Sequence, residues 1–246
     1  MIDYMAYSDM LKIQVDMCFP FEYGLYKKIG INNMSIVSEI GCGNAYFLNK
    51  LRSAFSTPKY FGYDISSELI KKAMLDKGNK GIVLNLGSIE DMREKADVIL
   101  LRLIMHQIQD RYKFLKQVTE RINPNGIIIV VDPLDEKFQI FPALPRFMIR
   151  LGSLRNILSP DQASRQISGL LLDEMRTLNF KLFEQEGYFI PSLLPGYKKK
   201  YYDYMKATNN MLGYSSKEII EINAWYSNSS AYAQIGLFIY VFKKVN

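Results

Sequence analysis

Residues 36–48 read Ile36-Val-Ser-Glu-Ile-Gly-Cys-Gly-Asn-Ala-Tyr-Phe-Leu48, and this stretch decides the fold. The β-branched, apolar run Ile36–Ile40 stops at a glycine, which predicts a buried parallel strand. Apolar residues at helical spacing over Asn44–Ala54 predict the helix that follows. Gly41 and Gly43 therefore lie in a strand-to-helix turn, where the lack of a Cβ allows positive φ and a close approach by a ligand.

A second strand, Tyr60-Phe-Gly-Tyr-Asp64, follows the glycine turn and ends on a carboxylate. A carboxylate at this place can accept hydrogen bonds from both hydroxyls of a ribose, which predicts a nucleoside-containing cofactor. Tyr46 stands where a dinucleotide-binding turn has its third glycine, and it is too large for that close packing. Glu39, two residues before the turn, would repel a phosphate but would suit a cofactor with a positive charge and an ammonium group.

The chain resembles the class I S-adenosylmethionine-dependent methyltransferases in the segment Glu39-Ile-Gly41-Cys-Gly43-Asn-Ala45, with Ala45 in place of the usual last glycine. The resemblance extends from about Ile36 to Pro133, includes Pro124-Asn-Gly126 before a buried run, and resumes at the final strand. It implies an α/β fold with a Rossmann-like, seven-stranded, mostly parallel doubly wound sheet. It also implies S-adenosyl-L-methionine as the methyl donor, with S-adenosyl-L-homocysteine as the product.

The same resemblance predicts which residues hold the cofactor. In the family, the turn after the third strand meets the adenine, commonly through an aspartate where this chain has Ser88. The following Asp91 is either part of that contact or the cap of a helical turn. The expected cofactor-binding residues are Glu39, Gly41, Gly43, Asp64, Ile65, Ser88, Ile89 and Arg102.

Strand and helix signals alternate along the chain, which predicts parallel strands joined by crossover helices in one domain, residues 1–246. Residues 1–30 are expected to form a helical cover that Pro20 divides in two. Residues 135–160 and 191–234 are expected to be helical insertions that form a lid over the active site. The expected strands are 36–40, 60–64, 81–86, 96–101, 127–131, 181–190 and 234–242, and further helices are expected over 66–77, 110–122 and 161–178.

His106 is the only histidine, and it follows the fourth expected strand at the edge where ligands bind. It is the candidate catalytic base, because methyl transfer needs alignment and at most the removal of one proton from the acceptor. The alternative is a histidine that packs beneath the cofactor. Asp132 ends the fifth strand with no carboxylate or carboxamide partners evident in the sequence, so we expect no metal site.

Aromatic residues are frequent in the segment 191–234, which contains the only tryptophan, Trp225. Flat apolar rings beside the catalytic edge would suit an aromatic or heterocyclic acceptor. The expected substrate-binding residues are Tyr7 in the N-terminal cover, Trp225 and Tyr226. Packing within the protein is the alternative for each ring.

The composition favours an ordinary globular protein, with 246 residues, 48% hydrophobic residues and 23% charged residues. Cys18 and Cys42 are the only cysteines, and the second lies inside the glycine turn, so a reducing compartment is expected. No apolar run reaches the ~20 residues that span a bilayer, and no secretory leader is evident. We therefore expect a cytoplasmic protein without a membrane partner.

A net charge of +6 raises the question of nucleic acid as a partner. The basic residues are spread along the chain apart from Lys198–Lys200, which we interpret as a solvated helix face. The Asn-Pro-Pro-Tyr type of signature is missing after the fourth strand, where Arg102-Leu-Ile-Met105 stands. We therefore expect a small-molecule acceptor, methylated at O or N in specialised metabolism. An RNA or protein methyltransferase and a catalytically silent cofactor-binding protein are the alternatives, and the oligomeric state is left open.

Overall fold

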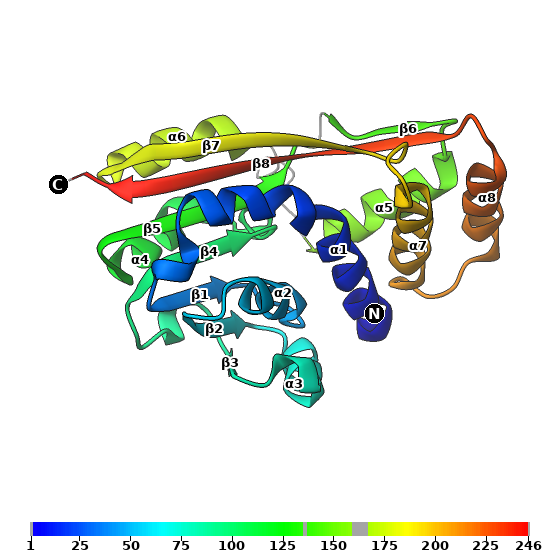
Figure 1. Ribbon diagram of the computed structural model, residues 1–246. Coiled ribbons are helices and arrows are strands. Elements are labelled where there is room, and N and C mark those ends of the chain that lie inside the picture. The colour runs from blue at the N-terminus through cyan, green and yellow to red at the C-terminus, as the bar shows by residue number, and fades with distance from the viewer. Residues whose placement is uncertain (1, 135–136, 159–166, 246) are drawn as a thin grey trace.

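Five parallel strands form the larger part of the sheet in the computed structural model, which describes residues 2–134, 137–158 and 167–245 (Figure 1). They lie in the order β3, β2, β1, β4, β5, and each neighbouring pair is parallel. Their bounds are β1 (Ile36–Ile40), β2 (Lys59–Asp64), β3 (Ile82–Leu86), β4 (Ala96–Arg102) and β5 (Ile122–Pro133). The chain reverses its winding direction between β1 and β4, and ligands bind at such a point in open α/β sheets.

Three antiparallel strands complete this eight-stranded sheet. The last, β8 (Tyr232–Lys244), pairs with β5 on one side and with β7 (Phe180–Pro191) on the other. A short strand, β6 (Gln139–Phe141), pairs with the first residues of β8. The predicted mostly parallel, doubly wound sheet is confirmed, and β6 is the addition that the sequence did not predict.

Helices cover both faces of the sheet, and successive residues of β4 show how the faces are divided. Val98 and Leu100 pack toward the helices that follow and precede β1, while Ile99 and Leu101 pack toward those that follow β4 and precede β7. Because side chains alternate across a strand and all four are buried, β4 is apolar throughout. The covering helices are α2 (Tyr46–Ala54), α3 (Ser67–Leu75), α4 (Arg111–Glu120) and α6 (Ile167–Thr177), with 3₁₀ turns at Ile31–Asn33, Lys77–Asn79, Ile89–Asp91 and Met105–Gln107.

The N-terminal cover is one helix, α1 (Tyr4–Lys28), which runs through Pro20 without the predicted division into two. Proline removes a single backbone N–H, and here its exposed ring faces away from the core. Cys18 before it and Leu25 after it are both fully buried, so packing on each side keeps the segment helical. Figure 1 shows α1 bending across the sheet toward the end that carries α5 and α7.

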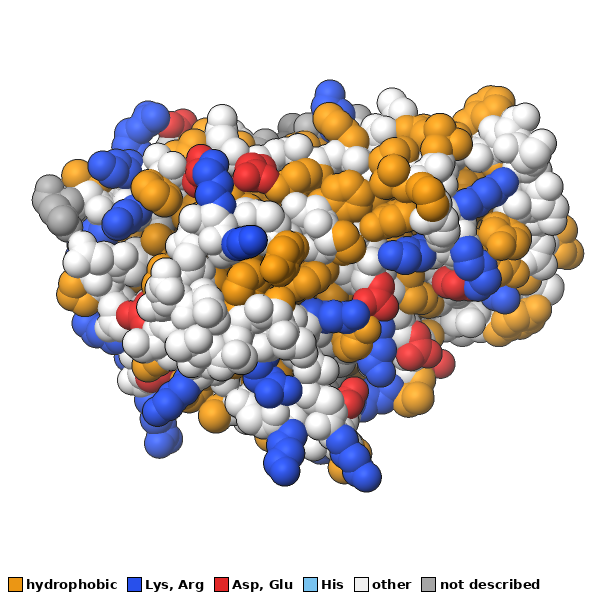
Figure 2. Space-filling model, viewed as in Figure 1, with side chains coloured by type: hydrophobic (Ala, Val, Ile, Leu, Met, Phe, Trp, Pro, Cys, Tyr) orange, Lys and Arg blue, Asp and Glu red, His pale blue; other side chains and the backbone are white. Residues whose placement is uncertain are grey.

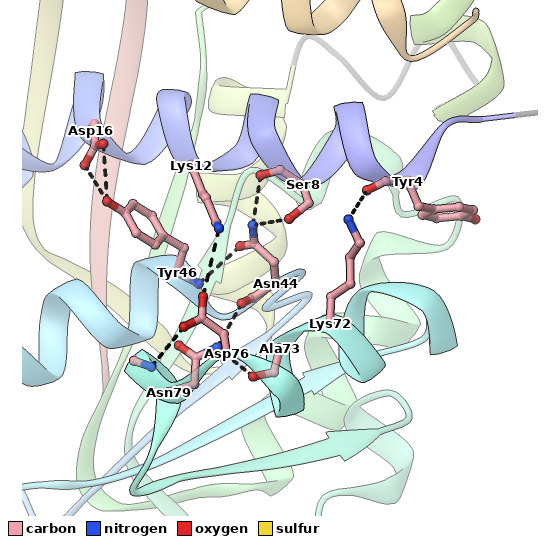
Figure 3. Close-up of polar contacts among 11 residues, drawn as sticks. Tyr4, Ser8, Lys12, Asp16, Asn44, Tyr46, Lys72, Ala73, Asp76 and Asn79 are labelled. Atoms are coloured by element: carbon pink, nitrogen blue, oxygen red, sulfur yellow. Dashed lines mark hydrogen bonds and ion pairs between the residues drawn. The ribbon is translucent and has the colours of Figure 1, made fainter.

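Polar contacts fix α1 to the glycine turn and to the helix that follows it (Figure 3). Asn44 donates from Nδ2 to the backbone oxygen of Ser8 at 2.9 Å and approaches its Oγ at 3.0 Å. The Tyr46 hydroxyl donates to Asp16 at 3.1 Å, about two turns further along α1 than Ser8. The residues that follow the glycines therefore hold the helical cover in place.

Three helices form a layer beside the far ends of β7 and β8: α5 (Pro145–Leu158), α7 (Tyr197–Asn210) and α8 (Ser216–Ser227) (Figure 1). Residues of α5, α7 and α8 share a buried apolar cluster with Met17 and Cys18 of α1. The described parts of the predicted insertions 135–160 and 191–234 are thus mainly helical. The remaining residues of the first insertion, and the start of the helix predicted over 161–178, lie outside the described residues.

Lys and Arg side chains are spread over the face drawn in Figure 2 and do not form one basic patch there. Lys198–Lys200 lie in the first turn of α7, where each amine has a partner within the protein. Lys199, for example, pairs with Asp203 at 2.5 Å, and Lys200 donates to the backbone oxygen of Asp16 at 2.8 Å.

Within the described ranges, the helices lack the length and apolar character needed to cross a membrane.

Candidate active site

A cavity of about 870 Å³ opens at the carboxyl ends of β1, β2 and β4, beneath α1 and beside α5 and α7. Its lining divides into two parts of different chemistry. The polar half lies at the strand ends and consists of Glu39, Gly41, Gly43, Asp64, Ser88 and Arg102. The helical half is mainly apolar, with polar groups at Arg155, Tyr204 and Thr208, and its apolar residues are Phe138, Ile140, Phe147, Leu151, Leu154, Leu158, Tyr201, Met205 and Ile235. The volume of the whole cavity lies in the range of pockets that hold a drug-sized ligand.

The glycine turn forms one wall of the polar half. Gly41 and Gly43 have φ values of +75° and +55°, where a side chain would be strained. A Cβ on Gly41 would collide with the side chain of Ile104, and a Cβ on Gly43 would lie 2.9 Å from Leu11 Cδ1 on α1. The sequence suggested that glycine serves the approach of a ligand. The structure adds that the turn must also fit between α1 and the chain beyond β4.

Asp64 joins the end of β2 to the glycine turn. Its Oδ2 accepts the backbone N–H of Gly43 at 2.7 Å, and its Oδ1 accepts that of Ser66 at 2.8 Å. Burial raises the pKa of this carboxyl, and the two N–H donors act in the opposite direction. Each carboxylate oxygen can accept a further hydrogen bond, so the side chain is held in place while it faces the cavity.

Glu39 lies at the floor of the polar half and is only 3% exposed. Its Oε2 has no hydrogen-bond partner among the described residues. Burial raises its pKa to about 8, partly opposed by Arg102 and reinforced by Glu22 and Asp64. Burial therefore disfavours the charged form of this carboxyl, and a cationic group placed beside Oε2 would favour it.

Arg102 lies at the end of β4 and forms a buried ion pair with Glu22 of α1. Its Nη2 lies 2.9 Å from Glu22 Oε1, and its Nε lies within 3.2 Å of both carboxylate oxygens. The sequence indicated Arg102 but missed its partner. Glu22 could have been found as a carboxylate flanked by apolar residues of a helix, because such a buried charge requires a counterion.

The residues expected near an adenine are only partly brought together. Ile65 and Ser88 line the cavity, whereas Ile89 is 1% exposed and packs in the core behind it. The Ser88 hydroxyl accepts the backbone N–H of Glu90 at 3.2 Å, and Asp91 accepts the N–H of Ser88 at 2.8 Å. Asp91 therefore caps a helical turn, as one of the two sequence-based interpretations proposed.

His106 lines the cavity just past β4, and its Nδ1 lies 2.5 Å from Oδ1 of Asp132. The other oxygen of this fully buried carboxylate accepts the backbone N–H of Met105 at 2.9 Å. Burial raises the Asp132 pKa, and the contact with His106 opposes that rise. When Asp132 is ionised it can only accept, so Nδ1 carries the proton; in the neutral ring Nε2, which lies 3.5 Å from Gln107 Nε2, is then an acceptor.

The sequence treated Asp132 as a strand terminus and missed this pairing. The signal was available, because β4 and β5 are parallel neighbours whose ends lie at one edge of the sheet. Between β4 and His106, Leu103 adopts φ +58°, a conformation that is rare for a bulky side chain. Such residues concentrate at functional sites, where surrounding contacts hold the backbone in place.

Of the three expected substrate-binding rings, Tyr7 of α1 lines the cavity. Trp225 does not: it is 1% exposed, packs in the cluster of α5, α7 and α8, and donates from Nε1 to the Phe141 carbonyl at 3.1 Å. Tyr226 also lies outside the lining and stacks on Tyr202, with ring centroids 4.4 Å apart. The packing interpretation describes both rings, because α8 stands behind α7 and away from the cavity.

Residues 32–176 match a family model described as a methyltransferase domain. No curated protein sequence matches the chain. Among solved structures, a candidate sarcosine dimethylglycine methyltransferase from Galdieria sulphuraria is similar, with a TM-score of 0.59, 14% identity, and coverage of 92% of this chain and 86% of the other. The YcgJ protein from Bacillus subtilis is similar at a TM-score of 0.53 and 18% identity, covering 92% and 100%. The plantazolicin methyltransferase BpumL, solved with a monoazolic desmethylPZN analogue and SAH, is similar at a TM-score of 0.51 and 14% identity, covering 98% of this chain and 85% of the other.

Proposed function

The chain belongs to the class I S-adenosylmethionine-dependent methyltransferases, and from that premise we propose that it methylates an O or N atom of a small molecule. The observation that carries the proposal is the cavity itself. One continuous space joins the glycine turn and Asp64, at one end, to the His106–Asp132 pair and an apolar helical half. It has room for an acceptor beside a nucleoside-sized cofactor.

The polar half fits the cofactor on two observations. The buried Glu39 carboxyl lacks a hydrogen-bond partner at Oε2 among the described residues, and an ammonium group would offset the cost of burying its charge. Asp64 is held by backbone N–H groups and can accept two ribose hydroxyls. We therefore assign cofactor binding to Glu39, the glycine turn and Asp64, with Ile65 and Ser88 toward the adenine.

The bound cofactor supplies an electrophilic methyl group on a positively charged sulfur. The protein's own contribution is to align the acceptor and to take its proton. In this proposal His106 Nε2 accepts that proton, and Asp132 stabilises the imidazolium while fixing the ring. Asp132 is a positioning residue, because it is fully buried and acts through the histidine.

Two buried free thiols, Cys18 and Cys42, support the proposal of a reducing, cytoplasmic location. Burial raises the Cys18 pKa to about 12, so it remains a neutral thiol at pH 7.

The test is a titration followed by a transfer assay. Calorimetry should show S-adenosylhomocysteine binding with one site per chain. Methyl-labelled S-adenosylmethionine should then deliver label to a small-molecule extract and not to bulk RNA or protein. Label in RNA or protein would favour the macromolecular alternatives, and binding without transfer would indicate a silent cofactor-binding protein.

A further inference from the structure

The helical half of the cavity presents hydrocarbon and aromatic surface. Phe147 and Leu151 of α5 face it with Met205 of α7, and all three are less than 9% exposed. The Tyr201 hydroxyl is satisfied within the protein, since it donates to the Ile190 carbonyl and accepts the Ile235 N–H at 2.9 Å. Tyr201 therefore offers its ring to the cavity. An acceptor body that fills this space must be mainly apolar.

The two arginines that line the cavity, Arg102 and Arg155, have contacts within the protein. Arg102 is neutralised by Glu22, and the Arg155 guanidinium at the side of the helical half lies 6.0 Å above the Phe138 ring. Burying an ionised group beside apolar side chains is costly unless it is paired. The lining therefore favours an acceptor that is neutral at the working pH.

The His106–Asp132 pair adds a chemical requirement. A paired base accelerates only those transfers in which the acceptor loses a proton. Carboxylic acids (pKa of about 4) are already ionised at pH 7, and alkylamines (pKa of about 10) are cationic. A phenol, also with a pKa of about 10, is neutral at pH 7 and still acidic enough to give up its proton. Of these groups, the phenol satisfies both the apolar surface and the base.

We propose, resting on the methyltransferase function above, that the acceptor is a neutral, largely apolar molecule with a phenol-type hydroxyl. The oxygen–carbon bond forms as the carbon–sulfur bond breaks, and the sulfur keeps the bonding electron pair. The hydroxyl proton passes to His106 Nε2 and from there to solvent. The products are an aryl methyl ether and neutral S-adenosylhomocysteine.

Three probes of one shape test the proposal: 2-naphthol, 2-naphthoate and 2-(aminomethyl)naphthalene. With S-adenosylhomocysteine bound, calorimetry should show 2-naphthol binding roughly tenfold or more tightly than either charged probe. With S-adenosylmethionine, 2-methoxynaphthalene should be formed, and the other two probes should be methylated at least about tenfold more slowly. His106→Asn should retain 2-naphthol binding and lose most of the ether product.

A matched pair of variants on α5 tests whether 2-naphthol binds in the helical half. Leu158→Glu adds a charge to the lining and should lower the affinity for 2-naphthol about tenfold. It should not change the affinity for S-adenosylhomocysteine. Ile149→Glu, on an exposed position outside the lining, should change neither. Preference for a charged probe, equal loss in both variants, or 2-naphthol bound without methylation would overturn this inference. Failure to bind S-adenosylhomocysteine would instead overturn the proposed function.

Discussion

The polar half and the helical half of the cavity are built in different ways. In the polar half, backbone groups fix the side chain of Asp64, which accepts the N–H groups of Gly43 and Ser66. These residues belong to a single β–turn–α unit and the strand beside it. In the helical half, side chains from α5 (Pro145–Leu158), α7 (Tyr197–Asn210) and β8 (Tyr232–Lys244) meet, although these elements are separate along the chain. The first is a local arrangement imposed by strand ends, while the second exists only after distant helices have packed.

This difference implies that each half can be damaged separately. Changes in the polar half should act on cofactor affinity and leave the fold intact. Changes in the helical layer should act on stability or on acceptor binding. The His106–Asp132 pair lies where the two halves meet. A substitution there should lower the rate of methyl transfer and leave the affinities for cofactor and acceptor nearly unchanged.

The largest effect is expected at that junction. His106→Ala removes the proton acceptor, and general-base catalysis contributes roughly 10²–10⁴ in rate. We expect kcat to fall by that factor with the S-adenosylhomocysteine affinity nearly unchanged, because the polar half is untouched. Asp132→Asn should lower kcat in the same direction, since the imidazole would lose its charged partner. Steady-state kinetics and calorimetry on the same preparations provide the two readouts.

An unaltered kcat in His106→Ala would mean that alignment alone promotes transfer. Loss of cofactor affinity in that variant would instead place His106 in the polar half, which would remove the distinction between junction and cofactor site.

Trp225→Ala should give the next largest effect, on stability alone. The ring is fully buried among α5, α7 and α8, and truncating such a side chain costs about 3–5 kcal/mol of unfolding free energy. Denaturant titration checks the loss, with Tyr226→Ala as the control because that ring is 37% exposed and should cost much less. The folded fraction should bind S-adenosylhomocysteine normally. A stable Trp225→Ala protein with a raised acceptor KM would return Trp225 to the substrate site.

Asp64→Ala should weaken the binding of S-adenosylhomocysteine by about 2–4 kcal/mol, the contribution of two hydrogen bonds to a charged group. Binding of 2-naphthol to the helical half should change little in the same variant. The variant also loses the acceptor for the Gly43 N–H, so thermal unfolding must be followed alongside calorimetry. Unchanged affinity in a folded Asp64→Ala protein would contradict the assignment of the polar half.

The sequence predicted the position of those residues whose place follows from the order of elements along the chain. Gly41 and Gly43 come after β1 and Asp64 ends β2, and parallel strands bring their carboxyl ends to one edge. The parallel strands were predicted for the same reason, since β-branched runs alternated with helical spacing. The short β6 escaped prediction because its three residues pair only with the start of β8, and three residues carry little periodicity.

The remainder depended on tertiary contacts. Whether Trp225 packs or binds is decided by which side of α7 its helix occupies, and local spacing contains no information on that point. The Glu22–Arg102 pair joins residues eighty positions apart, and the continuous α1 depends on buried partners on both sides of Pro20. Composition had suggested aromatic surface near the site, but only packing determines which rings reach the cavity.

The last prediction concerns Glu39 and the dependence of stability on pH. Burial raises the pKa of this carboxyl from 4.5 to about 8, in the presence of Arg102 on β4, Glu22 on α1 and Asp64 on β2. Between these values the folded protein holds a proton that the unfolded chain has released, so the unfolding free energy falls as pH rises. The stability that Glu39 contributes is complete below about pH 4.5 and is lost as pH passes through 8. Glu39→Gln cannot titrate, and its unfolding free energy should therefore decline less steeply between pH 5 and about pH 8. Denaturant titrations of both proteins across that range measure the difference, and parallel profiles would show that the polar half does not hold this carboxyl in its protonated form.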